Sequence, residues 1–286
     1  MADPALRRAL LDRQFILAPG VFDLISALIA DRAGFKALYV TGYGTIASYL
    51  GLPDAGLATY RDMLERVAQI VSMTRTPVIA DADTGFGGLL NVRHTVRGYE
   101  DAGASAIQIE DQEFPKKCGH TPGRRVIALE DMARKIGVAV DSRRSDDFLV
   151  VARTDARTAL GVGEAIRRGK AYAAAGADLV FVEALESEAE MRQVAAEIDA
   201  PLFANMVNGG ATPLLPAARL EEIGYSVAIH PAVGFLSAGA ALDKAYRDLR
   251  ANGETSAEIE LYPFAEFNRL MGFEQVWAFD SEYGEL

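Results

Sequence analysis

The chain has 286 residues, half of them hydrophobic, and a formal net charge of −11 at pH 7. This length and apolar content are enough for one large globular domain or two smaller ones. The acidic balance argues against nucleic acid and anionic membrane surfaces as partners, because both require a basic face.

The cysteine count and the lengths of the apolar runs indicate the compartment in which the protein is expected. A single cysteine rules out an intrachain disulfide, and no basic and apolar leader opens the chain. No apolar run approaches the roughly 18 to 20 residues needed to span a bilayer. We therefore expect a cytoplasmic protein. An anionic metabolite suits it as a ligand only where a metal ion or local lysine and arginine side chains offset the acidic charge.

Short apolar runs recur along the chain, each followed by a polar or glycine-rich turn and then by a segment of helical period. Helices are expected from about Phe22 and over Tyr60–Met73. Eight runs predict strands, at residues 15–18, 38–41, 78–83, 106–111, 149–154, 179–184, 202–207 and 227–231.

Apolar strands that alternate with amphipathic helices are typical of a parallel sheet covered on both faces. Eight such units in roughly 250 residues fit a closed (β/α)8 TIM barrel better than an open doubly wound sheet. In residues 101–107 and 174–180 a helix stops at a glycine and turns directly into a strand, which supports this fold. No fingerprint of spaced glycines follows the first strand, so a dinucleotide-binding fold is disfavoured.

The chain after about Ala251 departs from this period and carries aromatic residues and a short apolar helix near residues 267–271. We expect an α/β protein in which residues 1–286 form a single barrel domain. Residues 251–286 are expected to form a C-terminal helical extension that packs on a neighbouring subunit.

Active sites of such barrels lie at the carboxyl ends of the strands. Polar residues collect at these positions in this sequence. They are Thr41-Gly42-Tyr43, Asp81, Asp83, Glu110, Asp111, Arg153, Asp155, Glu183, Asn205 and His230.

Asp81 and Asp83 are two residues apart, so strand alternation places both on one face, and Glu110 ends the next strand. Three crowded carboxylates repel one another, and a hard divalent cation such as Mg²⁺, with Mn²⁺ as a substitute, removes that repulsion. The alternative is that Asp83 caps the following helix while Asp81 pairs with a lysine.

Arg153 ends an apolar strand, where a charge is unfavourable unless it meets an anion. Its guanidinium can grip a substrate carboxylate through two parallel hydrogen bonds. An internal salt bridge with Asp155 or Glu183 is the alternative. The segment Thr41-Gly42-Tyr43-Gly44 offers backbone amides for the same carboxylate, or is an ordinary turn.

The only cysteine, Cys118, lies in a polar loop that follows the strand ending in Glu110 and Asp111. Taken alone, a cysteine is more often a small core residue. Lys116, Lys117 and His120 flank this one, and such cations favour the thiolate and tune a proton donor.

Two further features suggest that this loop moves. Gly119 lets the chain bend close to a ligand. Pro115 and Pro122 bracket the segment, so it is predicted to act as a hinged lid.

The pentapeptide Lys116-Lys117-Cys118-Gly119-His120 follows Ile109-Glu110-Asp111 and, earlier, Asp81-Ala82-Asp83-Thr84-Gly85-Phe86-Gly87. This combination resembles the signature of the isocitrate lyase and phosphoenolpyruvate mutase superfamily, in which the cysteine marks the carbon–carbon lyases. The resemblance runs along nearly the whole chain. It implies a TIM barrel whose last helix is exchanged between partners, in dimers that pair into homotetramers.

The resemblance also assigns residues to roles. The implied metal ligands are Asp81, Asp83 and Glu110. The implied catalytic residues are Cys118, Lys116, Lys117, His120, Tyr39 and Glu183. The implied substrate-binding residues are Thr41, Gly42, Tyr43, Asp54, Arg153, Asn205 and Gly119.

These parts suit the stabilisation of an enolate, and the predicted reaction is a retro-aldol cleavage of a 2-hydroxy di- or tricarboxylate with Cys118 as general acid. Residues 205–215 and His230-Pro231 resemble the branch with dimethylmalate lyase, oxaloacetate hydrolase and petal death protein. Leu236 stands where methylisocitrate lyases carry an arginine, and Asn208 where the family usually has glutamate.

A substrate of the 2,3-dimethylmalate or alkylmalate type is therefore predicted. Oxaloacetate acetylhydrolase and methylisocitrate lyase are the alternatives. Phosphonate mutase or hydrolase chemistry, or a dicarboxylate-binding barrel without catalysis, is less favoured because neither needs Cys118 in this loop.

Overall fold

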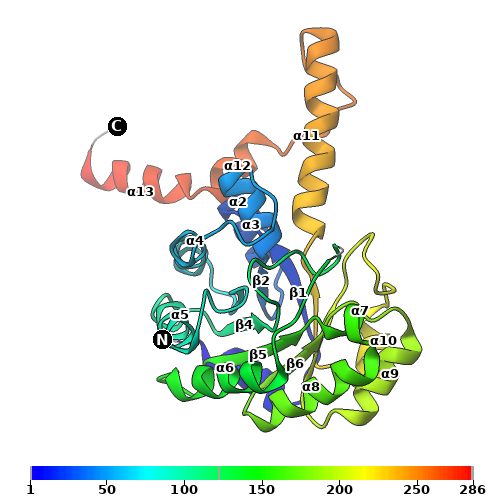
Figure 1. Cartoon of the computed structure of the whole chain (residues 1–286). Helices are drawn as coiled ribbons and strands as arrows, with labels where there is room; N and C mark the ends of the chain where they lie inside the picture. Colours follow the sequence, from blue (N-terminus) through cyan, green and yellow to red (C-terminus); the bar gives the residue numbers. More distant parts are fainter. Residues whose placement is uncertain (1, 122, 285–286) are drawn as a thin grey trace. The chain divides into compact units, whose positions relative to one another are not determined.

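The computed structural model describes residues 2–121 and 123–284, and in these residues eight parallel strands close into a barrel in chain order (Figure 1). The first strand pairs with both the second and the eighth, which closes the ring. The predicted (β/α)8 barrel is confirmed. The strands are β1 (Ile16–Val21), β2 (Leu38–Val40), β3 (Val78–Asp81), β4 (Ala106–Glu110), β5 (Leu149–Thr154), β6 (Leu179–Val182), β7 (Leu202–Asn205) and β8 (Val227–His230).

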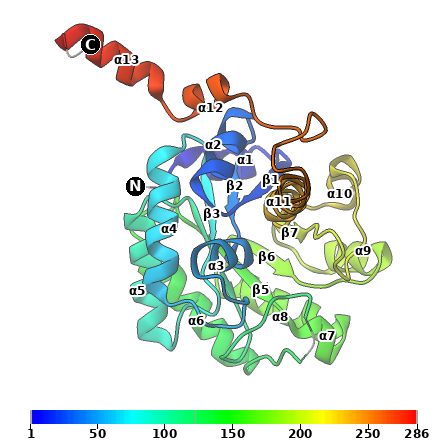
Figure 2. The ribbon, with the colours of Figure 1, turned by 90° about the horizontal axis from the view of Figure 1, so that it is seen from above.

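Most helices of residues 2–235 lie outside the ring of strands when the barrel is seen from above (Figure 2). Several begin at side-chain caps, as when the Thr59 side chain accepts from the Asp62 backbone N–H. Up to Phe235 the helices are α1 (Pro4–Leu11), α2 (Leu24–Arg32), α3 (Gly42–Leu50), α4 (Tyr60–Met73), α5 (Leu89–Asp101), α6 (Leu129–Ser142), α7 (Ala156–Leu160), α8 (Val162–Ala174), α9 (Glu188–Glu197) and α10 (Ala217–Ile223).

Apolar side chains fill the interior of the barrel. Tyr39, Phe181 and Phe203 lie among aliphatic residues of the other strands, and Leu6 of α1 belongs to the same buried cluster. Two further clusters form the layer in which helices pack on the outer face of the strands. The interior of the barrel is therefore a packed core, and an active site is expected at the carboxyl ends of its strands.

Strand ends differ from the predicted ranges where the backbone turns. Residues 82–83 and 183–184 continue apolar runs, but Asp83 and Ala184 have φ of 48° and 60°, which no strand accommodates. Strand β1 extends beyond the predicted 15–18 because Gly20 lets it lie against β8. A Cβ on Gly20 would lie 2.2 Å from the Pro231 carbonyl oxygen.

The chain from Leu236 onward forms a second compact unit. Its helices are the greater part of α11 (Val233–Asn252), then α12 (Phe264–Leu270) and α13 (Phe273–Tyr283). The expected short helix near residues 267–271 corresponds to α12. Among the described residues, no helix combines the length and the hydropathy that crossing a bilayer requires.

Candidate active site

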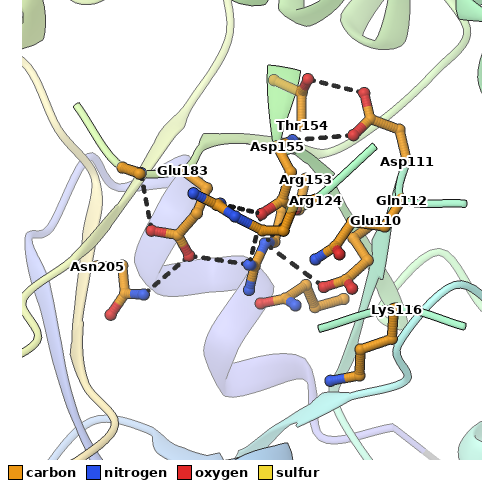
Figure 3. Close-up of polar contacts among 12 residues, drawn as sticks. Glu110, Asp111, Gln112, Lys116, Arg124, Arg153, Thr154, Asp155, Glu183 and Asn205 are labelled. Carbon is orange, nitrogen blue, oxygen red and sulfur yellow. Dashed lines mark hydrogen bonds and ion pairs between the residues drawn. The ribbon is translucent and has the colours of Figure 1, made fainter. Parts of the chain in front are cut away.

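The carboxyl ends of the strands bring together most of the predicted polar residues. Strand register places Glu110 of β4 directly beside Arg153 of β5. Glu183 follows β6 and Asn205 ends β7, and Figure 3 shows Arg153 between Glu183 and Glu110, with Lys116 on the side of Glu110. All five side chains are buried.

One part of the site is a cluster of carboxylates around a single ammonium group. Lys116 Nζ lies 2.6 Å from Asp83 Oδ1 and also pairs with Asp54. Burial acts to lower the pKa of Lys116, but Asp83, Glu110 and Asp54 outweigh it and raise that pKa well above its usual value. The surrounding carboxylates therefore favour the charged ammonium form of Lys116.

Burial acts on the pKa of Asp83 in the opposite direction from its action on the pKa of Lys116. Burial raises the pKa of Asp83 to about 6; Lys116 opposes this shift, while Asp81 and Asp54 add to it. The acids of this cluster are therefore close enough to repel one another.

Asp81 is held by three donors. The backbone N–H groups of Gly42 and Asp83 donate to it over 3.3 Å and 3.0 Å, and Gln108 Nε2 donates over 3.3 Å. Tyr39 Oη donates to Gln108 Oε1 over 2.8 Å, so Tyr39 reaches Asp81 through Gln108. A Cβ on Gly42 would lie 2.6 Å from Asp81 Oδ2, which explains why glycine is needed there.

The donor set fits a hard divalent cation by its chemistry. Among the described residues, no three Asp, Glu, His or Cys side chains converge as ready metal ligands. However, Glu110 Oε1 is buried and has no hydrogen-bond partner in residues 2–121 and 123–284, and Asp83 Oδ1 is bound only by Lys116. Burial also raises the pKa of Glu110 well above its usual value, against the effects of Arg153 and Lys116. Mg²⁺ keeps several waters and needs few protein carboxylates, so these oxygens suit it.

Arg153 forms the internal salt bridges that the sequence left open. Its Nε and Nη2 donate to Asp155 over 2.9 Å each, and Nη2 lies 3.1 Å from Glu183 Oε2. Its Nη1 has no hydrogen-bond partner within the described part of the chain. The bridges therefore orient the guanidinium and leave Nη1 as its unengaged donor.

Glu183 and His120 are fixed by groups on other loops. Glu183 accepts from the backbone N–H of Ala184 over 2.8 Å and from Asn205 Nδ2 over 3.0 Å. The Ala211 N–H donates to His120 Nδ1 over 3.3 Å, so the neutral imidazole carries its proton on Nε2. That nitrogen lies 3.4 Å from Glu183 Oε1.

The segment 112–121, called here the Cys118 loop, lies over these groups. The Cys118 backbone N–H donates to the Asp54 carbonyl over 3.1 Å. A Cβ on Gly119 would lie 2.2 Å from Arg153 Nη2 and 2.8 Å from Glu183 Oε2. The loop can therefore approach the site this closely only with glycine at position 119.

The expectation that flanking cations favour a Cys118 thiolate is wrong. Burial raises the pKa of the Cys118 thiol, and the opposing effects of the His120 backbone N–H and Arg153 do not cancel it. The lysines act little because Lys116 is bound to carboxylates and Lys117 points elsewhere. The thiol is therefore held in its protonated form.

Some predicted residues lie at the edge of the site. Lys117 is exposed, and its Nζ lies 3.5 Å from the Gly123 carbonyl oxygen. Tyr43 is 43% exposed, with its ring 5.3 Å from that of Phe235. Thr41 is the N-cap of α3, so the expected turn at residues 41–44 is the beginning of a helix. Pro122, the second predicted hinge, lies outside the described residues.

The sequence analysis missed Gln108 and Arg124 as residues of the site, and it listed Asp111 at a strand end without giving it a role. Gln108 supports Asp81, Asp111 supports Asp155 and Thr154, and Arg124 donates to Asp155 over 2.7 Å. A buried glutamine inside the apolar strand β4 was a usable signal. Arg124 gave none, since the side chains that it binds, Asp155 and Thr158, are more than 30 residues away.

Comparison with known proteins shows the family of this chain. Residues 6–250 match the family of phosphoenolpyruvate phosphomutase. The 2,3-dimethylmalate lyase of Eubacterium barkeri is 46% identical over 279 residues, which cover 97% of this chain and 96% of that protein.

Solved structures of related proteins are similar to this chain in both sequence and fold. A crystal structure of 2,3-dimethylmalate lyase, described as a PEP mutase/isocitrate lyase superfamily member, has a TM-score of 0.92 at 39% identity and covers 99% of this chain and 96% of its own. Phosphonopyruvate hydrolase in complex with oxalate and Mg²⁺ has a TM-score of 0.89 at 32% identity, with 99% of each chain covered.

An eight-stranded barrel with buried acids, an arginine and a cysteine loop at its carboxyl rim defines an enzyme of the carbon–carbon lyase class. The chain belongs to the phosphoenolpyruvate phosphomutase family, within the PEP mutase/isocitrate lyase superfamily. The predicted superfamily and enzyme class are confirmed.

Proposed function

We propose that the enzyme cleaves a 2-hydroxy dicarboxylate of the 2,3-dimethylmalate or alkylmalate type by a Mg²⁺-dependent retro-aldol reaction. The observation that carries this proposal is the position of a protonated Cys118 in the loop whose Gly119 lies against Arg153 and Glu183. A proton donor beside an anion-binding arginine suits the quenching of an enolate.

The substrate would be held at its carboxylate by Nη1 of Arg153, since Nε and Nη2 bind Asp155 and Glu183, and by backbone amides at the beginning of α3. The buried Asn205 Oδ1 has no hydrogen-bond partner among the described residues and offers an acceptor to a substrate hydroxyl. The Cys118 loop excludes water from this space.

Asp81, Asp83 and Glu110 would hold Mg²⁺, which Mn²⁺ could replace. The bound ion would supply positive charge to the substrate oxygens on which negative charge develops. The excess of buried acids supports this assignment, as does the Mg²⁺ in the related phosphonopyruvate hydrolase structure.

The proton balance assigns roles to the remaining groups. Cleavage of the C2–C3 bond turns the 2-hydroxyl into the carbonyl of a 2-oxo acid such as pyruvate and leaves the electron pair on C3. Burial raises the pKa of Tyr39 well above its usual value, so this phenol stays protonated, and the hydroxyl proton passes to a carboxylate of the site. The Cys118 Sγ–H then protonates C3, which gives the second carboxylic acid.

We further propose a cytoplasmic homotetramer, a dimer of dimers. The second compact unit supports this, because it exposes large apolar side chains that a free surface does not need. They include Leu242, Tyr246, Leu249, Trp277 and Phe279. A mass measurement in solution tests the tetramer directly.

The test of the reaction is a 2-oxo acid release assay with the Cys118→Ser variant and a panel of 2,3-dimethylmalate, 2-methylisocitrate, oxaloacetate and phosphonopyruvate. We expect Mg²⁺-dependent turnover of dimethylmalate by the wild type and a loss of at least about 100-fold in the serine variant. Mg²⁺ binding, measured by calorimetry, should be unchanged. A fully active serine variant would remove Cys118 from the mechanism, and a preference for 2-methylisocitrate or oxaloacetate would replace the proposed substrate.

A further inference from the structure

Arg124 lies three residues beyond the Cys118 loop and is only 9% exposed. A buried arginine has to be paired, and this one is paired on every side. Its Nε donates to the Thr121 carbonyl over 3.1 Å, its Nη1 to Asp155 Oδ1 over 2.7 Å, and its Nη2 to Thr158 Oγ1 over 2.6 Å. One rigid fork thus joins the end of the loop to the end of β5 and to α7.

The carboxylate that Arg124 holds is the one that orients Arg153. Asp155 Oδ1 accepts from both Arg124 Nη1 and Arg153 Nη2, and Oδ2 accepts from Arg153 Nε. Burial acts to raise the pKa of Asp155, but the two arginines outweigh it and lower that pKa below its usual value. Asp155 is therefore an anion shared by two guanidinium groups, as Figure 3 shows.

The position of Asp155 is also fixed from its other side. Its backbone N–H donates to Asp111 Oδ1 over 2.9 Å. Asp111 Oδ2 accepts from Thr154, Arg168 and Tyr172. Because this support is rigid, a change at Arg124 acts on the remaining adjustable partners of Asp155, which are Arg153 and the end of the loop.

We propose that Arg124 is a positioning residue that couples the placement of the Cys118 loop to the orientation of Arg153. The loop end and the substrate-binding guanidinium share one carboxylate, so neither takes its working position independently of the other. This inference rests on the proposed function, because it assigns Arg124 an effect on that reaction. Arginine is required because lysine, a point donor, cannot span Thr121, Asp155 and Thr158 at once.

The test compares Arg124→Lys with Arg125→Lys, a matched change at the next residue. Arg125 is exposed, and its side chain pairs only with Glu113 among the described residues. We expect Arg124→Lys to raise the KM for dimethylmalate and lower kcat/KM by about tenfold or more. The rate of Cys118 alkylation by iodoacetamide should rise at least about threefold, because the loop is less firmly held. Arg125→Lys should match the wild type in all three measurements.

The alkylation rate separates this inference from the proposed function, since it needs no turnover. If the wild type releases no 2-oxo acid but Arg124→Lys still exposes Cys118, the coupling stands while the reaction assignment fails. Thr158→Val, which removes one partner of Arg124, provides a second variant if Arg124→Lys does not fold; it should shift alkylation in the same direction by less. Alkylation and kcat/KM within twofold of Arg125→Lys in both variants would overturn the proposal.

Discussion

The two sides of the active site differ in their charge balance. The acidic side contains four buried carboxylates, Asp54, Asp81, Asp83 and Glu110, around the one ammonium of Lys116. The basic side contains two buried carboxylates, Asp155 and Glu183, and two guanidinium groups, Arg153 and Arg124. Both sides are equally removed from water, so the contrast reflects their composition and not their exposure.

This contrast shows how one site can serve two kinds of ligand. The acidic side has more negative charge than its own residues can neutralise, and among the described residues its Glu110 Oε1 has no hydrogen-bond partner, so an added cation suits it. On the basic side the two guanidinium groups balance the charge of the two carboxylates. The guanidinium of Arg153 is already oriented there. Such an arrangement binds an anion with little reorganisation.

The largest expected effect comes from pushing the loop away from the basic side. In Gly119→Ala the new Cβ would lie 2.2 Å from Arg153 Nη2, so either the loop or the guanidinium has to move. We expect kcat/KM for dimethylmalate to fall by on the order of 100-fold or more, because a displacement of about 1 Å near the reacting atoms has this effect. Steady-state kinetics measure the fall.

Gly137→Ala is the matched control, because a Cβ there would meet nothing within 4 Å. It should leave kcat/KM unchanged. If Gly119→Ala were as active as Gly137→Ala, the loop would not lie against Arg153 during turnover.

An intermediate effect is expected from neutralising one acid on the acidic side. Asp83→Asn keeps a residue that tolerates the φ of 48° but removes a negative charge. We expect the Kd for Mg²⁺, measured by calorimetry, to rise at least about tenfold. In Asp54→Asn, which removes the other partner of Lys116, the Kd for Mg²⁺ should stay close to that of the wild type.

Asp83→Asn also tests the acidic side through the pH dependence of protein stability. The pKa of Asp83 is raised to about 6 in the folded state, against about 3.9 in an unfolded chain. The folded state therefore binds this proton more tightly, and the wild type without Mg²⁺ should lose stability as pH rises from about 4 to about 6. Asp83→Asn should lack this loss, and melting temperatures across that range would show it. Parallel curves for both proteins would contradict the raised pKa.

The smallest effect concerns the thiol between the two sides. Because burial raises the pKa of Cys118, its alkylation by iodoacetamide should have a pH midpoint above that of an unfolded cysteine, about 8.5. The protein unfolded in urea serves as the reference. A folded midpoint below the reference would mean that the flanking cations control this thiol after all.

The sequence predicts the barrel well because its signals are local and repeated. The apolar run at residues 149–154 and the helical period at Tyr60–Met73 match β5 and α4 to the residue. Strand ends are less well predicted, since Asp83 and Ala184 leave the strand through a positive φ that side-chain hydropathy does not encode. β1 extends beyond the predicted range 15–18, because Gly20 allows the close contact with Pro231.

The active site likewise contains residues that the sequence predicts and residues that it does not. Asp81, Asp83, Glu110 and Arg153 were predictable because strand ends of a barrel meet at one rim. Their partners were not, since the pairing of Arg124 with Asp155 or of His120 with Ala211 depends on loops that approach each other only in three dimensions. The protonated state of Cys118 depends on its burial. The sequence does not show this burial, and the cations beside Cys118 in the sequence favour the opposite, ionised state.

The Cys118 loop is attached to several separate connections of the barrel. They include Asp54 after α3, Asp83 after β3, Ala211 after β7 and, through the loop end and Arg124, Asp155 after β5. Fluctuations that free one attachment leave the others in place, so escape of a bound molecule requires all of them to break nearly together. We therefore expect departure of products, more than bond cleavage, to set the pace of each catalytic cycle.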